Sequence, residues 1–432
     1  MKILIPNNNI AERKYIIDIL LGEFLGLEYK IEIKDTKNYE IILKNGNKLI
    51  IEDHFFNKCP KDLEYLNEKN IPQKVEFGNN DFIVEENIPI IYGTNKLITN
   101  HQSPITITCG IDIFASSFFM LTRWEEYVNK TRDIHNRFPA YASLAYKNNF
   151  LDRPVVNEYV EMLWNMLKFL GIKQERKKRE FEFVLTHDVD TALLDLKTLL
   201  LNPVKNKNIW LFLKYIKRFG KNYDTYDYLM DISEKIGTKS YFFLHSSNAN
   251  KRYDECNDMN LKKVTEKILK RGHFIGYHPS YNAFDNLKIF LEDKKRIEKL
   301  LETELKFGRM HYLKFLAPFT WRIWEEANME WDSTLGYPEK EGFRCGICYE
   351  FSVFDFLKRK KYRLKEKPLL AMDATFLSYE KITPIQMKHT ICELLKKVKK
   401  YQGEFVILWH NSSCDGIWKE YKEVYEKVLN EN

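Results

Sequence analysis

Six carboxylate and imidazole side chains in this sequence stand at the ends of short apolar runs. They are Asp188, Asp190, His245, His278, Asp373 and His410. Carboxylate oxygens and imidazole nitrogens are ligands for divalent metal ions, and the same groups transfer protons in acid–base catalysis. Burying a charge is costly unless it is paired or bound to a metal, so we interpret these residues as a candidate site. The alternative is that strand ends are polar simply because loops are hydrated.

The segment 181–190 combines a strand pattern with the densest of these polar clusters. Residues 181–185 are mainly apolar, and Thr186-His187-Asp188-Val189-Asp190 follow directly. A continuous apolar run is typical of a parallel strand that is covered on both faces. We therefore predict a buried strand whose carboxyl end carries Asp188 and Asp190.

Further strand candidates alternate with helical patterns through the second half of the chain. Strands are predicted at 239–245, 273–278, 313–318, 342–345, 368–373 and 404–410, and helices at 260–271, 287–305 and 384–401. Repeated strand–helix units predict an α/β fold with a parallel sheet, and about seven strands suit a barrel or partial barrel. All six candidate residues fall at predicted strand carboxyl ends, the face that carries the active site in α/β barrels.

In motif order and spacing, most of 181–415 resembles the polysaccharide deacetylases of the NodB-homology type, carbohydrate esterase family four. The first motif of that family carries a catalytic base and a metal-binding aspartate, matched here by Asp188 and Asp190. Its second motif, His-Ser/Thr-x-x-His, is matched by His278-Pro279-Ser280-Tyr281-Asn282. Its last motif, Leu-x-His, is matched by Leu408-Trp409-His410, which makes His410 the counterpart of the catalytic acid.

The resemblance implies a distorted or incomplete (β/α) barrel that removes acetyl groups from sugars with one divalent metal ion. Zinc is the first expectation, with nickel or cobalt as alternatives, and the implied substrate is an N-acetylated sugar of a surface polysaccharide or its precursor. Asp188 would accept a proton from water, and His410 would donate one to the leaving atom. Two other functions stay open: a catalytically inactive glycan-binding or scaffold protein on the same fold, and a hydrolase of another carbon–nitrogen amide bond.

The second motif departs from the family pattern at its last position. Asn282 stands where the second metal-binding histidine is expected, four residues after His278. An amide oxygen is a poorer zinc ligand than an imidazole. Either Asn282 is a ligand, or His187, His245 or water completes the metal site.

The third motif lacks its arginine, because Leu316 stands two residues before Pro318. We expect Arg309 or Arg344 to supply the positive charge that orients the catalytic base. Asp332 is a candidate partner for such an arginine, and closing a turn is its alternative role. Asp373 is predicted as a further supporting residue.

Residues 1–172 are predicted to form a smaller α+β domain, joined by the polar linker 173–180 to the barrel at 181–432. Strand patterns occur at 2–5, 31–34, 39–43, 48–52, 88–93 and 105–110, and helical spacing at 11–25, 112–127 and 155–170. Through its stretch 118–127 this region resembles the extra domain of a bacterial subgroup found with surface-polysaccharide genes. Asp133, His135 and Arg137 lie in a polar loop that could reach a neighbouring site.

Composition and charge narrow the function classes. The chain has 432 residues, of which 44% are hydrophobic and 30% charged, which indicates a soluble globular protein. Its net charge of +7 is spread along the chain, so no nucleic-acid partner is predicted. Without a long apolar run or a signal-peptide pattern, a cytoplasmic location is expected. Peripheral membrane contact through the basic, aromatic segment 204–220 is an alternative to packing of that segment on the barrel.

The seven cysteines are scattered, which argues against a disulfide framework. Cys345 and Cys348 form a Cys-x-x-Cys pair with no second pair elsewhere. A zinc ribbon is therefore not expected at this pair.

Overall fold

The structure is a computed structural model that describes residues 1–190, 192, 224–245 and 258–431. Within the first 172 residues, a six-stranded mixed sheet has the order β2-β1-β3-β4-β8-β7. Its strands are β1 (Lys2–Pro6), β2 (Lys30–Lys34), β3 (Tyr39–Ile42), β4 (Lys48–Ile51), β7 (Gly93–Asn100) and β8 (Thr106–Ile111). A short antiparallel pair, β5 (Glu76–Gly78) and β6 (Ile88–Ile90), stands beside this sheet.

Helices accompany the N-terminal sheet and bury its apolar side chains. They are α1 (Ile10–Ile17), continued by the π-helical segment Asp18–Phe24, then α2 (Ile113–Thr122), α3 (Trp124–Val128), α4 (Leu144–Lys147) and α5 (Val155–Phe169). Period-two alternation in β3 points Tyr39 and Ile41 inward, where the Tyr39 ring lies 4.6 Å from that of Phe114 in α2. The mixed strand-and-helix character predicted for this region is confirmed.

The second sheet contains nine strands among the described residues and has the order β14-β15-β13-β12-β11-β10-β9-β17-β16. The strands are β9 (Glu182–Val189), β10 (Tyr241–Leu244), β11 (Phe274–Tyr277), β12 (Phe307–Gly308), β13 (Trp331–Asp332), β14 (Phe351–Asp355), β15 (Lys360–Glu366), β16 (Ala371–Met372) and β17 (Glu404–Leu408). Pairing is parallel from β16 through to β15, while β14 pairs antiparallel with β15. The strand order ends at β14 and β16, which leaves the sheet open between them.

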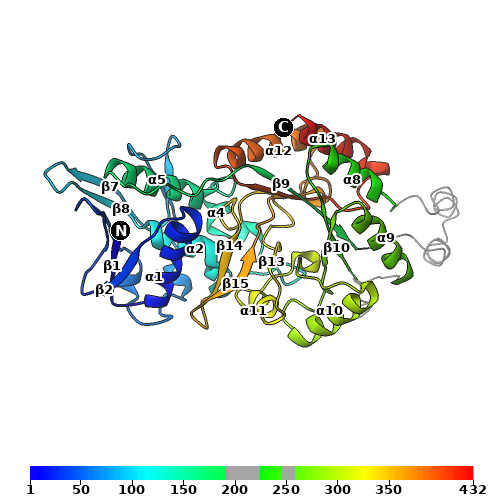
Figure 1. Ribbon diagram of the computed structural model, residues 1–432, viewed down its shortest axis with the longest axis horizontal. Coiled ribbons are helices and arrows are strands. Elements are labelled where there is room, and N and C mark those ends of the chain that lie inside the picture. Colours follow the sequence, from blue (N-terminus) through cyan, green and yellow to red (C-terminus); the bar gives the residue numbers. More distant parts are fainter. Residues whose placement is uncertain (191, 193–223, 246–257, 432) are drawn as a thin grey trace.

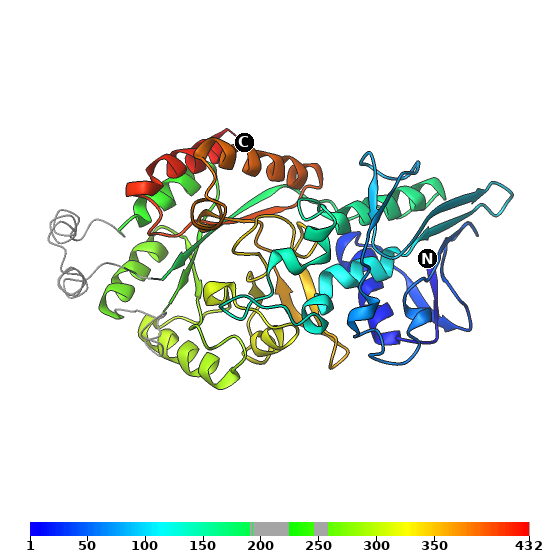
Figure 2. The same ribbon diagram turned by 180° about the vertical axis from the view of Figure 1, so that it is seen from behind.

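The helices of this region lie in an arc around the strands (Figure 1). They are α8 (Tyr226–Lys235), α9 (Asp258–Lys270), α10 (Leu287–Leu301), α11 (Phe319–Glu326), α12 (Pro384–Lys400) and α13 (Lys419–Asn430). The view from behind shows the N-terminal region beside the β14–β15 edge, with the β7–β8 hairpin pointing away from the second sheet (Figure 2). Because helices cover the outer face and the interior is packed, residues 184–189 of β9 are all buried.

Two of the predicted strands are wrong. Residues 313–318 instead follow a 3₁₀ turn, His311–Leu313, in which Tyr312 and Leu313 have positive φ. The strand at this position of the sheet is the two-residue β12, which comes earlier in the chain. Residues 342–345 form a turn flanked by Gly342 and Gly346, whose φ angles of +129° and +66° are incompatible with an extended ladder.

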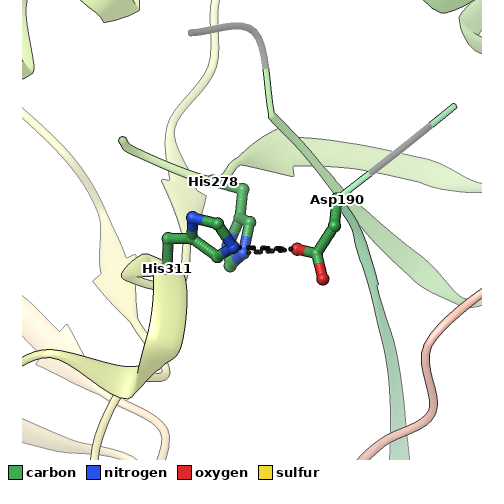
Figure 3. A group of neighbouring side chains, drawn as sticks. All are labelled: Asp190, His278 and His311. Atoms are coloured by element: carbon green, nitrogen blue, oxygen red, sulfur yellow. Dashed lines mark ion pairs between the residues drawn. The ribbon is translucent and has the colours of Figure 1, made fainter. Parts of the chain in front are cut away.

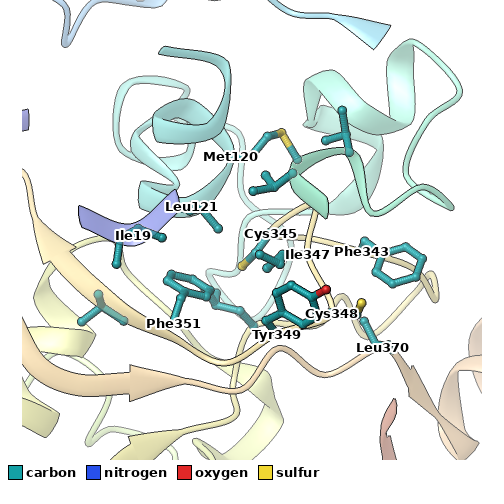
Figure 4. Close-up of a cluster of buried hydrophobic side chains, with 14 of the residues drawn as sticks. Ile19, Met120, Leu121, Phe343, Cys345, Ile347, Cys348, Tyr349, Phe351 and Leu370 are labelled. Atoms are coloured by element: carbon teal, nitrogen blue, oxygen red, sulfur yellow. The ribbon is translucent and has the colours of Figure 1, made fainter. Parts of the chain in front are cut away.

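The two regions share a continuous hydrophobic core, which runs through the Cys-x-x-Cys segment. Figure 4 shows Cys345 and Cys348 among apolar side chains that include Met120 and Leu121 of α2. The Cys348 backbone N–H also donates to Oδ1 of Asn157 in α5, at 3.0 Å. These cysteines therefore act as packing residues between the regions.

The linker 173–180 has no regular secondary structure, and it contacts both the region before it and the region after it. The Lys177 N–H donates to the carbonyl of Leu25 at 2.8 Å, and the Arg179 guanidinium lies 4.0 Å from the ring centre of Tyr349. The linker is thus docked on both regions.

Membrane-spanning helices are absent from the described part of the chain. None of the helices described there combines the length and apolar character needed to cross a bilayer. The segment 204–220, for which peripheral membrane contact is an alternative, lies outside the described residues.

Candidate metal centre and catalytic pocket

The carboxyl ends of the parallel strands meet at a cavity of about 330 Å³. Its polar lining includes Asp188 and Asp190 from the end of β9, His278 after β11, His311 after β12 and His410 after β17. Four of these residues were predicted as site residues from the sequence, and the structure brings them together although they span more than half of the chain. Its apolar lining is Leu313, Pro338, Met372, Ala374 and Leu408.

Asp190, His278 and His311 form a cluster whose ligand atoms all lie within 4.8 Å of one another (Figure 3). Nε2 of His278 and Nε2 of His311 are each 3.3 Å from Oδ1 of Asp190. Nδ1 of His278 lies 2.7 Å from the carbonyl oxygen of Arg309, and because a carbonyl only accepts, this nitrogen carries the proton. In the neutral imidazole, Nε2 of His278 then directs its lone pair at a carboxylate oxygen, an arrangement that a cation between the two would stabilise.

Asp188 is buried next to this cluster, and Arg309 holds its carboxylate in place. Nη1 of Arg309 donates to Oδ1 of Asp188 at 2.9 Å and to the Thr186 hydroxyl at 3.0 Å. The same guanidinium donates through Nε to the carbonyl oxygen of Ser333 at 2.7 Å, so its plane is fixed on both sides. Oδ2 of Asp188 lies 3.8 Å from Nε2 of His278, which places the second oxygen of this carboxylate beside the cluster.

His410 faces the cluster from the β17 side of the cavity. Its Nδ1 lies 2.7 Å from Oδ1 of Asp373, and its Nε2 lies 3.9 Å from Oδ2 of Asp190. Burial alone would lower the pKa of His410, but the charge and hydrogen bond of Asp373, with the charges of Asp190 and Asp188, raise it to about 10. Burial likewise opposes ionisation of Asp373, yet His410 holds the pKa of that carboxyl below its ordinary value. The pair therefore consists of a protonated imidazole and a carboxylate.

His187 and His245 are buried near the cavity but outside its lining. Nδ1 of His187 lies 2.7 Å from the carbonyl oxygen of Trp409, and its Nε2 lies 3.2 Å from the Ser240 hydroxyl. Burial lowers the pKa of His187 to about 4, so its ring is neutral at physiological pH. Nδ1 of His245 lies 3.0 Å from the carbonyl oxygen of His278, and its ring packs 4.9 Å from that of His311. His245 thus orients two members of the cluster, while both nitrogens of His187 point at protein oxygens.

Seven sequence-predicted site residues lie outside the cavity lining: His187, His245, Arg309 and Asp373, described above, and Asn282, Arg344 and Asp332. Asn282 is exposed in a turn after β11, and His311 completes the cluster of possible ligands in its place. Arg344 does not reach Asp188, because its guanidinium pairs with Glu126 of α3 at 2.6 Å. Asp332 is buried and accepts a hydrogen bond from the Thr334 hydroxyl, while burial raises its pKa to about 7.

His311 is the site residue that sequence reasoning missed. The strand before it, β12, is two residues long and one of them is a glycine, so no apolar run marks it. The available signal was the Arg309-Met310-His311 sequence itself, in which one residue separates a basic side chain from an imidazole. In the structure Arg309 pairs with Asp188, and His311 lies 3.3 Å from Asp190.

Arg137, from the polar loop of the N-terminal region, also lines the cavity. Its Nε donates to Oδ2 of Asp133 at 2.7 Å, and its Nη1 donates to the carbonyl oxygen of Tyr312 at 2.9 Å. The loop is therefore attached to the residue that follows His311.

A family model covers the N-terminal region of the chain. Residues 1–171 match a model described as "Family of unknown function (DUF7033)". A search of curated proteins finds no match.

Solved structures resemble the chain over 57–59% of its length. A candidate polysaccharide deacetylase from Mycobacterium smegmatis is 14% identical, with a TM-score of 0.40 over 59% of this chain and 84% of that one. A probable polysaccharide deacetylase from Pseudomonas aeruginosa PAO1 is 11% identical, with a TM-score of 0.39 over 58% and 84%. A CE4 family pseudoenzyme from Bacillus anthracis is 9% identical, with a TM-score of 0.30 over 58% and 60%. At these identities and TM-scores, the function has to be inferred from the geometry of the pocket itself.

Proposed function

We propose that this protein is a metal-dependent deacetylase acting on an N-acetylated sugar of a surface polysaccharide or its precursor. The observation that carries the proposal is the position of Asp188. Its carboxylate is fixed by Arg309 on one side and lies 3.8 Å from His278 of the Asp190–His278–His311 cluster on the other. A general base next to a set of metal ligands, with a protonated imidazole across the same cavity, is the arrangement needed to hydrolyse an amide.

The donor set fits a divalent metal ion. One carboxylate oxygen and two imidazole nitrogens are ligands that zinc accepts, and the same set also suits nickel or cobalt. We propose Asp190, His278 and His311 as the residues that hold the ion. When bound, the ion supplies a Lewis acid that polarises the carbonyl oxygen of the acetyl group.

The residues of this chain account for the proton transfers. Asp188 accepts a proton from water, the water oxygen forms a bond with the acetyl carbon, and the carbon–nitrogen bond of the acetamide breaks. His410, held protonated by Asp373, donates a proton to the departing sugar nitrogen. Acetate and a free amino sugar result, and the proton on Asp188 returns to solvent or to His410.

The test is acetate release from N-acetylglucosamine oligosaccharides by chelator-treated protein, with and without added zinc, nickel or cobalt. We expect activity to depend on the metal and to fall by about 10²–10⁴-fold in Asp188→Asn, the range that one general base contributes. Asp152→Asn, an exposed carboxylate whose side chain is 64% accessible, is the matched control. Equal activity of wild type and Asp188→Asn, or no acetate with any of the three metals, would overturn the proposal.

The same experiment separates the alternatives. Binding of the oligosaccharide without acetate release would identify an inactive glycan-binding protein. Hydrolysis of other amides, with no release of acetate, would identify a hydrolase of a different carbon–nitrogen bond.

A further inference from the structure

The catalytic cavity adjoins a second cavity of about 650 Å³, built largely by the N-terminal region. Arg137 and Tyr379 line both cavities, so the two share a wall. The second cavity, called the outer cavity below, is lined also by Arg132, Ile134, Tyr141 and Glu339. A ligand that reacts beside Asp188 would therefore extend over the loop of the N-terminal region.

The loop that forms this wall is held firmly by hydrogen bonds. Oδ1 of Asp133 accepts the backbone N–H groups of His135 and Arg137, both at 2.9 Å. The His135 ring bonds to the Tyr281 hydroxyl at 3.0 Å, and the Ala140 N–H donates to Glu339 at 2.5 Å. Contacts to both regions on either side make the wall preformed, which reduces the entropy cost of binding a ligand there.

The outer cavity presents aromatic and aliphatic surface together with scattered polar groups. Tyr141 is 55% exposed, Tyr379 is 42% exposed and Ile134 is 94% exposed. Exposed apolar groups gathered at a cavity mark binding surfaces. A sugar ring offers C–H groups to the face of an aromatic ring and hydroxyl groups to neighbouring polar atoms, so this lining suits carbohydrate.

The charged groups of the outer cavity, two arginines and two carboxylates, are already engaged in hydrogen bonds within the protein. The Arg137 guanidinium is paired with Asp133 at 2.7 Å. The Arg132 guanidinium donates to the backbone carbonyls of Glu126, Asn129 and Thr131. An anionic group such as a diphosphate would have to displace these bonds, whereas an uncharged sugar would not.

The volumes of the two cavities indicate how many sugar units the ligand has. A pocket of about 330 Å³ is near the lower end of the roughly 300–1,000 Å³ range for small-molecule sites, and suits one sugar unit. The outer cavity is about twice as large. We infer that it is a subsite for the uncharged sugar units that flank the reacting one, so that the substrate is an oligosaccharide or longer glycan rather than a monosaccharide or a nucleotide-linked sugar. This inference rests on the proposed function for the identity of the reacting sugar.

Binding to the metal-free chain of 432 residues tests the subsite without requiring turnover. Calorimetry would compare N-acetylglucosamine, its β-1,4-linked tetramer and uridine-diphosphate N-acetylglucosamine. We expect the tetramer to bind at least about tenfold more tightly than the monomer, and Tyr141→Ala to weaken tetramer binding about tenfold, the order of one lost aromatic contact. Tyr146→Ala removes another exposed tyrosine, 43% against 55% for Tyr141, that lies outside the outer cavity, and it should leave tetramer binding unchanged.

Equal dissociation constants for monomer and tetramer would overturn the inference, as would equal effects of Tyr141→Ala and Tyr146→Ala. Tighter binding of the nucleotide sugar than of the tetramer would do the same. Tyr141-dependent binding of the tetramer without acetate release would refute the proposed reaction but keep the subsite. Acetate release at the same kcat/KM from monomer and tetramer would keep the reaction but refute the subsite.

Discussion

Asp373 accepts two hydrogen bonds from His410: Oδ1 accepts one from the imidazole Nδ1 at 2.7 Å, and Oδ2 accepts one from the backbone N–H at 2.9 Å. Both the direction of the ring and its proton therefore depend on one buried carboxylate. In the metal-free protein we expect the His410 pKa to lie far above 6.5, near 10. Asp373→Asn should lower it by more than one unit, because burial then opposes the charged form with less compensation. An NMR titration of ¹³C-labelled imidazole, assigned with a His410→Gln variant, measures both values.

The sign of the effect on stability follows from these pKa directions. A raised His410 pKa stabilises the fold fully below about pH 6.5, and this contribution is lost as the pH rises toward 10. A lowered Asp373 pKa stabilises the fold above its unfolded value of 3.8, and that contribution is lost in acid. A His410 resonance that titrates near 6.5 in both wild type and Asp373→Asn would contradict the pairing.

Arg309 is a positioning residue, and Arg309→Lys tests that role. Lysine keeps the positive charge but cannot bond Asp188, Thr186 and Ser333 from one rigid plane. We expect kcat to fall by about 10–100-fold with KM within about twofold, because a small displacement of the base slows the reaction more than it weakens binding. Steady-state kinetics on the oligosaccharide substrate measures the split.

The control for this substitution is Arg363→Lys, at a side chain that is 83% exposed. It should change neither kinetic constant. A rise in KM alone for Arg309→Lys would show that Arg309 serves substrate binding and not the orientation of Asp188.

Substitutions at His311 and at Asn282 should affect metal affinity differently. His311→Ala removes one of three clustered ligands and should weaken zinc affinity by at least about 100-fold, since even supporting residues of metal sites cost 10–100-fold. Asn282→Ala changes an exposed side chain and should leave affinity within about twofold. Competition with a chromophoric chelator measures both constants without an activity assay. Loss of affinity in Asn282→Ala, with His311→Ala unaffected, would restore the assignment suggested by the sequence motif.

The contrast between His311 and Asp188 shows where local sequence is informative. Asp188 follows an apolar strand that the pattern of β9 predicts directly, because both faces of that strand are buried. His311 follows a two-residue strand whose position depends on parallel pairing with β11 and β13. Such pairing cannot be read from the local sequence, so His311 was not predicted as a ligand. The spacing of the motif pointed to Asn282 instead.

Long-range contacts explain the remaining differences. The sequence marked Arg309 and Arg344 as equivalent candidates to pair with Asp188. The docking of α3 against the second region distinguishes the two arginines, because Arg344 pairs with Glu126 of α3 whereas Arg309 pairs with Asp188. The sequence indicates only that Arg137 lies in a polar loop, because its place in the wall of the cavity depends on the same contact between regions.

Glu126 joins the two regions and should be a main contributor to their joint stability. Its carboxylate bonds to Arg344 at 2.6 and 2.9 Å and to Arg123 at 2.9 Å, and all three side chains are buried. Burial opposes its ionisation, but Arg344 and Arg123 hold the pKa of Glu126 below its ordinary value. Arg123 also pairs with Glu125 at 3.3 Å, so removing the Glu126 charge leaves mainly the buried Arg344 uncompensated, which costs roughly 3–5 kcal/mol.

We therefore expect Glu126→Gln to lower the free energy of unfolding by about 3 kcal/mol or more, measured by urea denaturation at neutral pH. Glu182→Gln, at the exposed start of β9, should change it by less than about 0.5 kcal/mol. Because the core is continuous between the regions, tryptophan fluorescence and circular dichroism should report one coincident transition in the wild type. An unchanged midpoint in Glu126→Gln, or a wild-type transition that splits in two, would show that the regions are stabilised independently of this contact.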